Sequence, residues 1–370
     1  MTMPYDLIVV GGGVMGSAAA LQAARGGMRV ALLEQATLAS GASGVNAGTL
    51  SLSIKRVALM PFALKGYAWW QEAGEAVGYR RTGGATLAFS PAEADLLEQR
   101  AKLKAAAGAP IEMISPKALA EREPALSREV VAATWCDADG YSNSSLTGTY
   151  FRALLRAGGV ETREQTRVQA IARTSGGFTV ETAAGHFSAT RLLLASGAWL
   201  EPVAAMLGVA LKPRVRVNTV SVTERSGRLL RGVIGHATGL LTLKQKENGT
   251  VLIGGGWQGR GAPSDGRGEV VAEALLGNLR LAEFAVPALR TLRLVRAWTG
   301  FEANMPDFYP LAGALPGVPN AFVLGCVRGG YTIGPYIGRL LGDLILGRDP
   351  ELPLFDPGRF ATRAASLQET

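Results

Sequence analysis

The sequence predicts two interleaved domains, a Rossmann-like α/β domain and an antiparallel-sheet α+β domain. Three observations support this fold class. The chain opens with a strand–turn–helix–strand pattern, its middle alternates with the period of β-strands, and its end returns to a strand followed by a helix. With 370 residues, the chain is also long for a single domain.

The opening pattern is a βαβ unit. Residues 5–10 form a continuous apolar run, typical of a buried parallel strand, and a glycine turn leads into a helix that reaches about Arg25. The strand "RVALLE" follows at 29–34. Further helices are expected at 92–107, 115–126 (capped by Ser115), 145–160, 270–286 and 334–347. Further strands are expected at 167–199, 214–224, 250–256 and 321–326.

Composition narrows the classes of function. The two cysteines and the two histidines (His186 and His236) are too few and too far apart for a disulfide framework or a metal cluster, so no metal is expected. The net charge of +8 comes from scattered Arg and Lys, which suits anionic ligands as well as nucleic acid. We expect a small-molecule substrate rather than nucleic acid. The N-terminus lacks a signal-peptide pattern and no apolar run is long enough for a membrane span, so a cytoplasmic protein is expected.

The glycine turn has the spacing of a dinucleotide-binding motif. Gly11, Gly13 and Gly16 spell G-x-G-x-x-G between the first strand and the first helix. This spacing allows a tight turn, a close approach of the backbone to a pyrophosphate, and close packing of helix on strand. Glu34 ends the second strand, where a carboxylate can accept the ribose hydroxyls of an adenosine. Val14, Met15 and Gln35 are expected to contact the same ligand.

A second glycine-rich segment, "ASGASGVNAGTL" at 39–50, reads as a flexible loop. Small polar residues alternate with glycines, which suits a loop that wraps a ligand with its backbone N–H groups. A plain surface loop is the alternative. The position directly after Glu34 favours contact with the cofactor.

At this point the chain resembles the D-amino-acid-oxidase-type flavoproteins. Within them it is most similar to glycine oxidase, hydrogen cyanide synthase and the β subunits of heteromeric sarcosine, hydroxyproline and opine oxidases or dehydrogenases. The resemblance covers nearly the whole chain. Its motifs are the opening βαβ unit, "GASGVNAGTL", "RLLLASGAW", "LKQKENGTVLIGG", "RAWTGFEANMPDFYPLAG" and "VLGCVRGGYTIGPYIGRLLGDLI".

The resemblance implies FAD, bound non-covalently because residues 290–315 hold no cysteine for a flavin linkage. It places the loop from Ser43 along the flavin and the backbone of Val168 against the adenine. It also closes the turn from Gly325 over the isoalloxazine, with the next helix pointing its N-terminus at the ring. The implied cofactor contacts beyond the opening βαβ unit are Ser43, Asn46, Ala47, Gly48, Thr49, Val168, Ser196, Gly197, Trp199, Gly325, Arg328, Gly329, Gly330, Tyr331 and Thr332.

The expected domain boundaries follow from this assignment. The FAD-binding domain takes residues 1–84, 141–212 and 298–365, and the substrate-binding domain takes 85–140 and 213–297. The segment "WTGFEANMPDFYP" at 298–310 contains too much proline for one helix and is too polar for a plain core strand. By resemblance it leads from the substrate domain back to the flavin domain, with Asp307 and its flanking prolines fixing a turn.

The resemblance also implies the chemistry. In such enzymes the flavin takes a hydride from the carbon next to a neutral amine, and the imine hydrolyses. Arg328 matches an arginine of the family and would clamp a substrate carboxylate, while Tyr331 would line the site or pack beneath it. Glu302 departs from the pattern, since glycine oxidase and hydrogen cyanide synthase have an arginine here that holds the substrate carboxylate. A glutamate would instead repel a carboxylate and attract a cation. Lys244 is expected to face the same cavity.

A second departure, Val217–Asn218–Thr219 in place of the family's R-G-Q, also argues against simple glycine or small D-amino acids. The expected function is FAD-dependent oxidation of an amino acid or N-substituted amino acid by the catalytic β-type subunit of a heteromer whose partner subunits carry further electron carriers. The alternatives are a stand-alone glycine or D-amino acid oxidase that uses O2, and a non-catalytic FAD-bearing assembly subunit. A nicotinamide dehydrogenase would need a second fingerprint, which the sequence lacks.

Overall fold

The computed structural model describes residues 4–360 of the chain. These residues form two compact units, each assembled from separate stretches of sequence. Unit 1 contains the residues up to Gly44, Ser145–Val215, and the residues from Glu302 onward; unit 2 contains Val45–Ser144 and Arg216–Phe301. The expected pairing of an α/β domain with a mainly antiparallel one is confirmed. The division of the chain by ligand, in which 45–84 joins the FAD-binding domain, stays a prediction.

Unit 1 is built on a sheet with a parallel centre. Strands β19, β12, β1, β2 and β9 lie in that order and are mutually parallel, while an antiparallel meander extends from β12 and one further strand pairs with β19. Strands β1 and β2 are almost fully buried, as their continuous apolar sequences require. The strands are β1 (Tyr5–Val10), β2 (Val30–Leu33), β9 (Glu161–Arg163), β10 (Val168–Thr174), β11 (Gly177–Thr182), β12 (Gly185–Leu194), β18 (Leu311–Ala314) and β19 (Ala321–Gly325).

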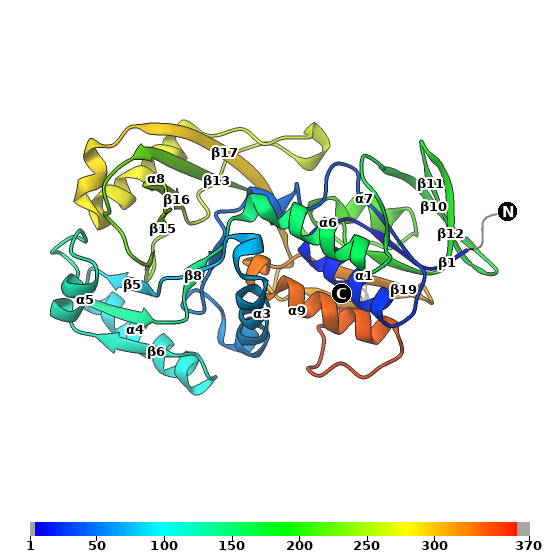
Figure 1. The fold of residues 1–370 in the computed structure, drawn as a ribbon, viewed down its shortest axis with the longest axis horizontal. Helices are drawn as coiled ribbons and strands as arrows, with labels where there is room; N and C mark the ends of the chain where they lie inside the picture. Colours follow the sequence, from blue (N-terminus) through cyan, green and yellow to red (C-terminus); the bar gives the residue numbers. More distant parts are fainter. Residues whose placement is uncertain (1–3, 361–370) are drawn as a thin grey trace, which may run out of the picture. The chain divides into compact units, whose positions relative to one another are not determined.

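Two long helices of unit 1, α1 (Val14–Arg25) and α9 (Gly330–Ile345), pack closely side by side (Figure 1). Gly334, Gly338 and Gly342 recur every fourth residue of α9 and form the contact stripe. A Cβ atom at any of them would lie 2.5–2.9 Å from an atom of α1. The glycines therefore let the first helix of the chain pack against the last one. The remaining helices of the unit are α2 (Ala42–Val45, which runs into unit 2), α6 (Thr147–Ala157), α7 (Leu200–Ala205) and the 3₁₀ turns η4 (Gly197–Trp199) and η7 (Pro357–Phe360).

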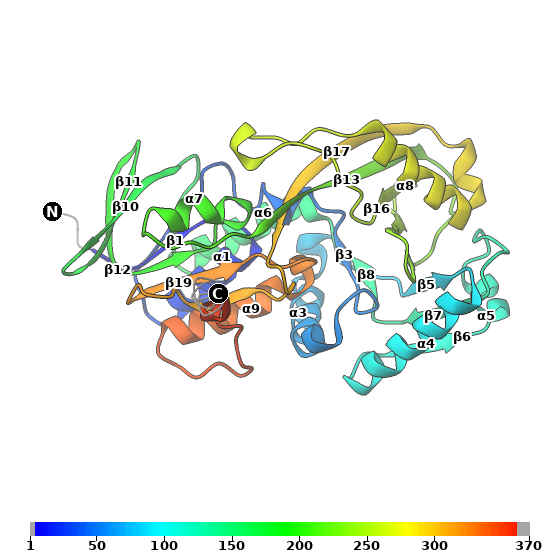
Figure 2. The ribbon, with the colours of Figure 1, turned by 180° about the vertical axis from the view of Figure 1, so that it is seen from behind.

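Unit 2 is built on an eight-stranded sheet with the order β17-β13-β16-β15-β14-β5-β7-β6. Figure 2 shows β13 and β17 running beside each other as two long strands. The pairs from β13 to β14 and from β5 to β6 are antiparallel, whereas β14 and β5 are parallel. The strands are β5 (Gly84–Ala88), β6 (Ile111–Ile114), β7 (Ala132–Cys136), β13 (Arg214–Arg225), β14 (Val233–His236), β15 (Thr242–Gln245), β16 (Thr250–Gly254) and β17 (Leu294–Asn304).

A small three-stranded sheet and several helices complete unit 2. The small sheet has the order β3-β8-β4. The expected cap of α5 is confirmed, because Ser115 Oγ accepts a hydrogen bond from Ala118 N at 3.2 Å. These elements are β3 (Thr49–Leu50), β4 (Arg80–Arg81), β8 (Gly140–Tyr141), α3 (Met60–Ala73), α4 (Pro91–Ala106), α5 (Pro116–Arg122), α8 (Ala272–Ala285) and the 3₁₀ turns η1 (Val57–Leu59), η2 (Gly74–Val77), η3 (Ser144–Leu146), η5 (Pro263–Asp265) and η6 (Pro287–Thr291).

The segment 298–310 begins in a strand. Its first seven residues belong to strand β17, which lies at the end of its sheet and not in the core, in agreement with the expectation that the segment is too polar for a plain core strand. β17 ends the order of its sheet and its residues are mostly only partly buried, which leaves room for polar side chains.

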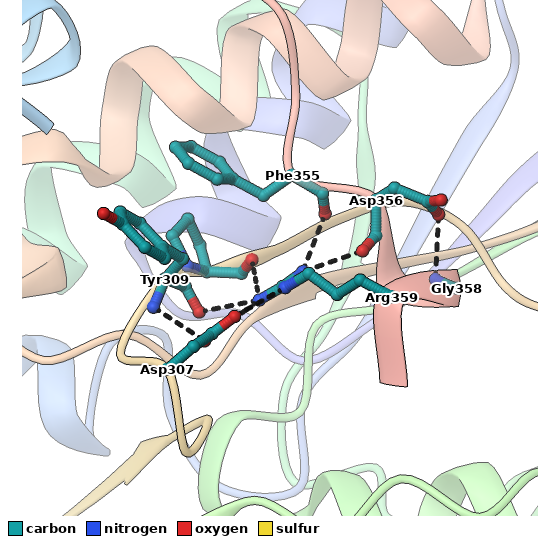
Figure 3. Close-up of polar contacts among 7 residues, drawn as sticks. Asp307, Tyr309, Phe355, Asp356, Gly358 and Arg359 are labelled. Atoms are coloured by element: carbon teal, nitrogen blue, oxygen red, sulfur yellow. Dashed lines mark hydrogen bonds and ion pairs between the residues drawn. The ribbon is translucent and has the colours of Figure 1, made fainter. Parts of the chain in front are cut away.

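The remainder of that segment is a turn held from a distance (Figure 3). Arg359 donates to the Asp307 carboxylate at 2.8 Å and to the carbonyls of Tyr309 and Pro310. The Asp307 carboxylate also accepts the N–H of Tyr309 at 3.0 Å. The expectation that Asp307 fixes a turn agrees with these bonds, although Arg359 was not foreseen.

Candidate functional site

The Gly11–Gly16 turn needs two of its glycines for steric reasons. Gly11 has φ +110°, and a Cβ there would lie 2.4 Å from the carbonyl oxygen of Ala195. A Cβ on Gly16 would lie 2.2 Å from the Gly11 carbonyl oxygen. Strand, turn and helix are thus in contact through backbone atoms alone, the geometry expected of a dinucleotide-binding turn.

The N-terminus of α1 presents amide groups that no acidic residue of its own first turn neutralises. Gly13 is the N-cap and provides no side-chain cap, and the first turn contains no acidic residue. Ser43 approaches from another segment, and its Oγ accepts the N–H of Val14 at 3.0 Å. Because the helix dipole concentrates positive potential here, this end of α1 suits a phosphate group.

Glu34 directly follows β2 and lies beside the same turn. Its Oε2 accepts the N–H of Gly12 at 2.8 Å and its Oε1 accepts the N–H of Ala36 at 2.8 Å. Burial raises the pKa of Glu34, and these two hydrogen bonds oppose the rise. Each carboxylate oxygen keeps a second lone pair, so the group can still accept from two ribose hydroxyls.

Other predicted residues of unit 1 lie at the ends of strands. Val168 begins β10 and is buried, and Gly197 and Trp199 form η4 directly after β12. Ser196 Oγ is buried and has no hydrogen-bond partner within residues 4–360. A buried hydroxyl normally has a partner, so this atom fits a site that a ligand completes.

The turn before α9 has an unusual backbone. Gly325, Cys326 and Gly329 have φ values of +137°, +57° and +68°, so the chain reverses sharply between β19 and the helix. Arg328 lies at this turn with an exposed side chain. The Tyr331 hydroxyl instead bonds to Thr147 Oγ1 at 2.8 Å. Gly330 and Thr332 lie in the first turn of α9, where Thr332 is fully buried.

In unit 2, the segment 45–49 is not the flexible loop that the sequence suggested. Asn46 Oδ1 accepts the N–H of Gly48 at 2.7 Å, which forms a local turn. Gly48 has φ +71°, and a Cβ there would lie 2.1 Å from the Ser142 carbonyl oxygen. The preceding residues form the short helix α2, and Thr49 begins β3. Gly48 is therefore needed here for close packing against Ser142.

Lys244 lies on β15 and is fully buried. Its Nζ donates to the Ala47 carbonyl at 2.8 Å and to the Thr49 hydroxyl. Burial, with a further contribution from nearby Lys246, lowers the pKa of Lys244 well below the ordinary value for lysine. The ammonium is thus directed at the segment that the sequence assigned to the flavin. Its expected contact with substrate stays a prediction.

Strand β17 carries Trp298, Gly300 and Glu302 on the same side, because side chains alternate along a strand. Trp298 Nε1 donates to the Val45 carbonyl at 2.7 Å, and a Cβ on Gly300 would lie 2.3 Å from Val45 Cγ2. Glu302 is only partly buried.

Apart from Glu302, which lies on β17 where unit 1 resumes, the structure places the predicted residues in two groups. One lies in unit 1 around the starts of α1 and α9, and the other lies in unit 2 around the segment 45–49. Sequence reasoning missed the roles of Trp298, Ser144 and Ser142. Trp298 belongs to the W-x-G motif and could have been singled out, whereas the two serines gave no signal. His236 accepts the N–H groups of Thr238 and Gly239 through Nδ1, which is a structural role.

Metal ligation and membrane crossing find no support in the described residues. Between residues 4 and 360, no group of three or more His, Cys, Asp and Glu side chains is arranged to hold a metal ion. None of the helices in that range is long and apolar enough to cross a bilayer.

Comparison with known proteins gives one family match and several full-length relatives. The model of the family described as FAD dependent oxidoreductase (DAO) matches residues 6–344. Glycine oxidase of Geobacillus kaustophilus is 28% identical, covering 93% of this chain and 94% of that protein. One of the subunits of the opine oxidase of Rhizobium meliloti is 26% identical over 97% of this chain and 99% of its own length. The crystal structure of L-proline dehydrogenase from P. horikoshii superposes with a TM-score of 0.90 at 23% identity, covering 98% of this chain and 99% of that one, which shows the shared fold.

Proposed function

Because the chain belongs to the DAO family of FAD-dependent oxidoreductases, we propose that it oxidises an N-substituted amino acid as the catalytic β-type subunit of a heteromeric dehydrogenase or oxidase. Membership of the family makes the chain an FAD-binding enzyme that acts on amino-acid C–N donors. The N-substituted substrate and the partner subunits are the parts that we propose.

The residues of unit 1 fit FAD. The uncapped start of α1 suits the pyrophosphate, and Glu34 has lone pairs for the ribose hydroxyls. Ser196 Oγ, buried among the predicted contacts, would gain a partner from the cofactor. We assign the FAD contacts of unit 1 to Gly11, Gly13, Val14, Met15, Gly16, Glu34, Gln35, Ser43, Val168, Ser196, Gly197, Trp199 and the turn 325–332, and those of unit 2 to residues 46–49.

The flavin supplies the redox chemistry when bound, by accepting a hydride from the carbon next to the amine so that an imine forms and hydrolyses to a carbonyl. The chain's own residues bind and orient the substrate. Arg328 has an exposed guanidinium at the turn before α9 and would clamp a carboxylate through two N–H groups. The Tyr331 hydroxyl forms a hydrogen bond with Thr147 Oγ1. No nucleophile is required, which suits a chain with two histidines.

Glu302 is the observation that carries the substrate proposal. By the resemblance of the W-x-G segment, it stands where glycine-oxidase-type enzymes would have an arginine for the substrate carboxylate. A carboxylate here disfavours a plain amino-acid carboxylate and favours a cationic group on the N-substituent. Arg328 would then be the one proposed residue that binds the substrate carboxylate.

The proposed subunit role is supported by one relative. The matching polypeptide of the Rhizobium meliloti opine oxidase aligns with this chain over nearly the whole length of both proteins. Its name describes one subunit of an enzyme that oxidises opines, and opines are by definition N-substituted amino acids. A β-type subunit would pass electrons to partners rather than directly to O2.

A substrate panel with anaerobic photometry tests the proposal. The purified chain is mixed without oxygen with opines, sarcosine, proline, D-hydroxyproline, glycine and D-alanine, and loss of the visible flavin band is followed. We expect N-substituted amino acids to bleach the flavin faster than glycine or D-alanine. Glu302→Arg should shift the ranking toward substrates with an additional carboxylate, and Glu302→Gln is the matched control for loss of charge alone. An unchanged ranking in Glu302→Arg would contradict the substrate proposal.

A stand-alone oxidase is the second candidate, favoured by the 28% identity to glycine oxidase over most of both chains. It differs in its electron acceptor. Rapid re-oxidation of the reduced flavin by O2, with stoichiometric hydrogen peroxide, would favour this candidate. Slow re-oxidation by O2 with fast re-oxidation by an artificial dye would favour the heteromeric enzyme. An assembly subunit without catalysis would show no bleaching by any amine.

A further inference from the structure

The segment Val45–Thr49 is held by an unusual series of hydrogen bonds, all within unit 2. Four successive carbonyl groups, from Val45 to Gly48, accept bonds of 2.6–2.8 Å from groups distant in sequence. In the order of their acceptors, the donors are Trp298 Nε1, Ser144 Oγ, Lys244 Nζ and Ser142 N. Three of the four donors are side chains.

Lys244 contributes most to this arrangement because it bonds at two places. Besides the Ala47 carbonyl, its Nζ donates to the hydroxyl of Thr49, two residues further on. The lysine thereby fixes both the direction of the backbone at Ala47 and the start of β3. The separation of almost 200 residues between Lys244 and its partners means that no local preference could achieve this.

Packing does not account for a lysine at this position. Lys244 is 0% exposed, and removing an ammonium from water carries a large desolvation cost. A methionine has a similar length and would fill the same space without that cost. Buried ionic groups of this kind are often less stabilising than apolar replacements. The gain from the lysine therefore lies in what its hydrogen bonds fix.

We propose that Lys244 is a positioning residue: it fixes the Ala47–Thr49 backbone in the conformation that contacts the flavin, and it does not touch the substrate. This rests on the proposed function, in which residues 46–49 contact FAD. The role replaces the substrate contact that the sequence suggested for Lys244. Trp298 acts in the same way on Val45, through its indole N–H.

Lys244→Met tests the proposal in the full-length chain. Apoprotein is titrated with FAD and binding is followed by the quenching of flavin fluorescence, while the visible circular dichroism of the bound flavin reports its environment. We expect the Kd for FAD to rise at least about tenfold and the visible dichroism to change. The melting temperature of the apoprotein should stay the same or rise, because an unneeded buried charge is removed.

Lys104→Met is the matched control. Lys104 is a partly buried lysine of unit 2. Like Lys244, it donates from Nζ to a main-chain carbonyl, but that carbonyl belongs to Ser53, outside the segment Val45–Thr49. Its replacement should leave the Kd for FAD and the visible dichroism unchanged. A change equal to that of Lys244→Met would overturn the proposal, because it would point to a general loss of structure.

A double-mutant cycle tests whether Lys244 affects FAD affinity through its hydrogen bond to Thr49. Thr49→Val removes the hydroxyl that Lys244 bonds, so the effects of Lys244→Met and Thr49→Val on FAD affinity should be less than additive. Additive effects would contradict action through Thr49. If Lys244→Met does not fold, Trp298→Phe keeps an aromatic side chain and removes the indole donor to Val45. It should weaken FAD binding in the same direction, and unchanged binding would overturn the proposal.

The outcomes distinguish this proposal from the function on which it rests. Failure of the wild-type chain to bind FAD would contradict the function itself. Normal FAD binding by the wild type, with Lys244→Met unchanged in Kd and dichroism, would contradict only the positioning role. Unchanged FAD binding together with a loss of kcat in Lys244→Met would make Lys244 a substrate contact and would also overturn the positioning role.

Discussion

Two backbone segments assigned to FAD are built by opposite means. In unit 1, the Gly11–Gly16 turn is fixed by steric contact, since both glycines approach backbone atoms, of Ala195 and of Gly11, too closely for a Cβ. In unit 2, the segment Val45–Thr49 is fixed by hydrogen bonds from donors that lie 94 to 253 residues away. The first depends on the absence of side chains and the second on their presence.

The two segments should therefore differ in which substitutions they tolerate. A sterically fixed turn offers few tolerated changes, because any added Cβ meets backbone atoms that cannot move far. A segment held by side-chain donors can be loosened one bond at a time. We therefore expect unit 2 to be the place where the environment of the flavin is adjusted, and unit 1 to be the place where binding is either retained or lost.

The largest expected effect is a loss of stability when a glycine of the Gly11–Gly16 turn is replaced. Gly11→Ala would place a Cβ 2.4 Å from the Ala195 carbonyl oxygen at φ +110°, so we expect a loss of about 3 kcal/mol in the free energy of unfolding. Urea denaturation of the apoprotein measures it. Gly13→Ala is the control, since Gly13 has φ −69° and its Cβ would meet only Ser43 Oγ, at 3.2 Å. Equal stabilities of the two variants would refute the steric account.

The next prediction concerns the contribution of long-range side-chain hydrogen bonds to the stability of unit 1. Arg359→Met removes the donors to Asp307 and to four carbonyls, and we expect a loss of about 1–2 kcal/mol at neutral pH for this partly exposed group. Arg339→Met is the control, because it removes a partly exposed ion pair with Glu351 and a ring contact with Tyr336 in its own helix, but no bond to a distant carbonyl. Chemical denaturation of both variants gives the comparison.

The same variant has a pH signature. Burial would raise the pKa of Asp307, yet the bonds from Arg359 and the Tyr309 N–H hold it below its ordinary value. A carboxyl group with a lowered folded-state pKa stabilises the fold at neutral pH, and that contribution is lost as the pH falls through the folded-state pKa. The stability difference between wild type and Arg359→Met should therefore narrow below about pH 4. A gap that widens on acidification would be inconsistent with the ion pair.

A smaller effect concerns the buried lysines of unit 2. Burial lowers the pKa of Lys104 to about 8, whereas an unfolded lysine keeps its proton to about pH 10.4. The unfolded chain therefore binds more protons between these values, so stability should rise with pH from about 8 to 10. Lys104→Met should flatten this rise. Lys102→Met, in the same helix with an exposed side chain, should keep the wild-type profile.

The smallest expected effect concerns a helix cap that belongs to neither segment. Ser115→Ala removes the acceptor for the Ala118 N–H at the start of α5, which should cost about 0.5–1 kcal/mol in unfolding free energy. FAD affinity should not change, since α5 carries none of the proposed contacts. A weaker FAD affinity in this variant would show that affinity follows overall stability rather than the two segments.

The sequence could predict the parts that local rules determine. The glycine spacing 11-13-16 and the apolar run before it predict the turn between β1 and α1, and Glu34 follows from its place at the end of β2. Ser115 was recognisable as a cap because serine before a helical pattern has a specific bonding role. In these cases a short pattern or a characteristic spacing in the sequence marks the residue, whether or not its partner lies nearby.

The remaining features could not be predicted because they depend on tertiary pairing. Lys244 reads as an ordinary strand lysine until β15 places its Nζ at Ala47 and Thr49. Arg359 gives no hint of Asp307, 52 residues earlier. Residues 298–304 read as too polar for a plain core strand, and only the order of the sheet shows that they belong to β17 at its end. Alternation predicts which side a residue faces but not which segment lies there.

Hydrogen exchange of the full-length chain tests most directly whether both segments contact the cofactor. Exchange is measured by mass spectrometry for the apoprotein and for the FAD-saturated protein, in peptides covering 11–16 and 45–49, with a peptide covering 115–122 as the reference. We predict that FAD slows exchange in both segments and leaves the reference unchanged. Protection confined to 11–16, with 45–49 exchanging equally in both states, would contradict the account.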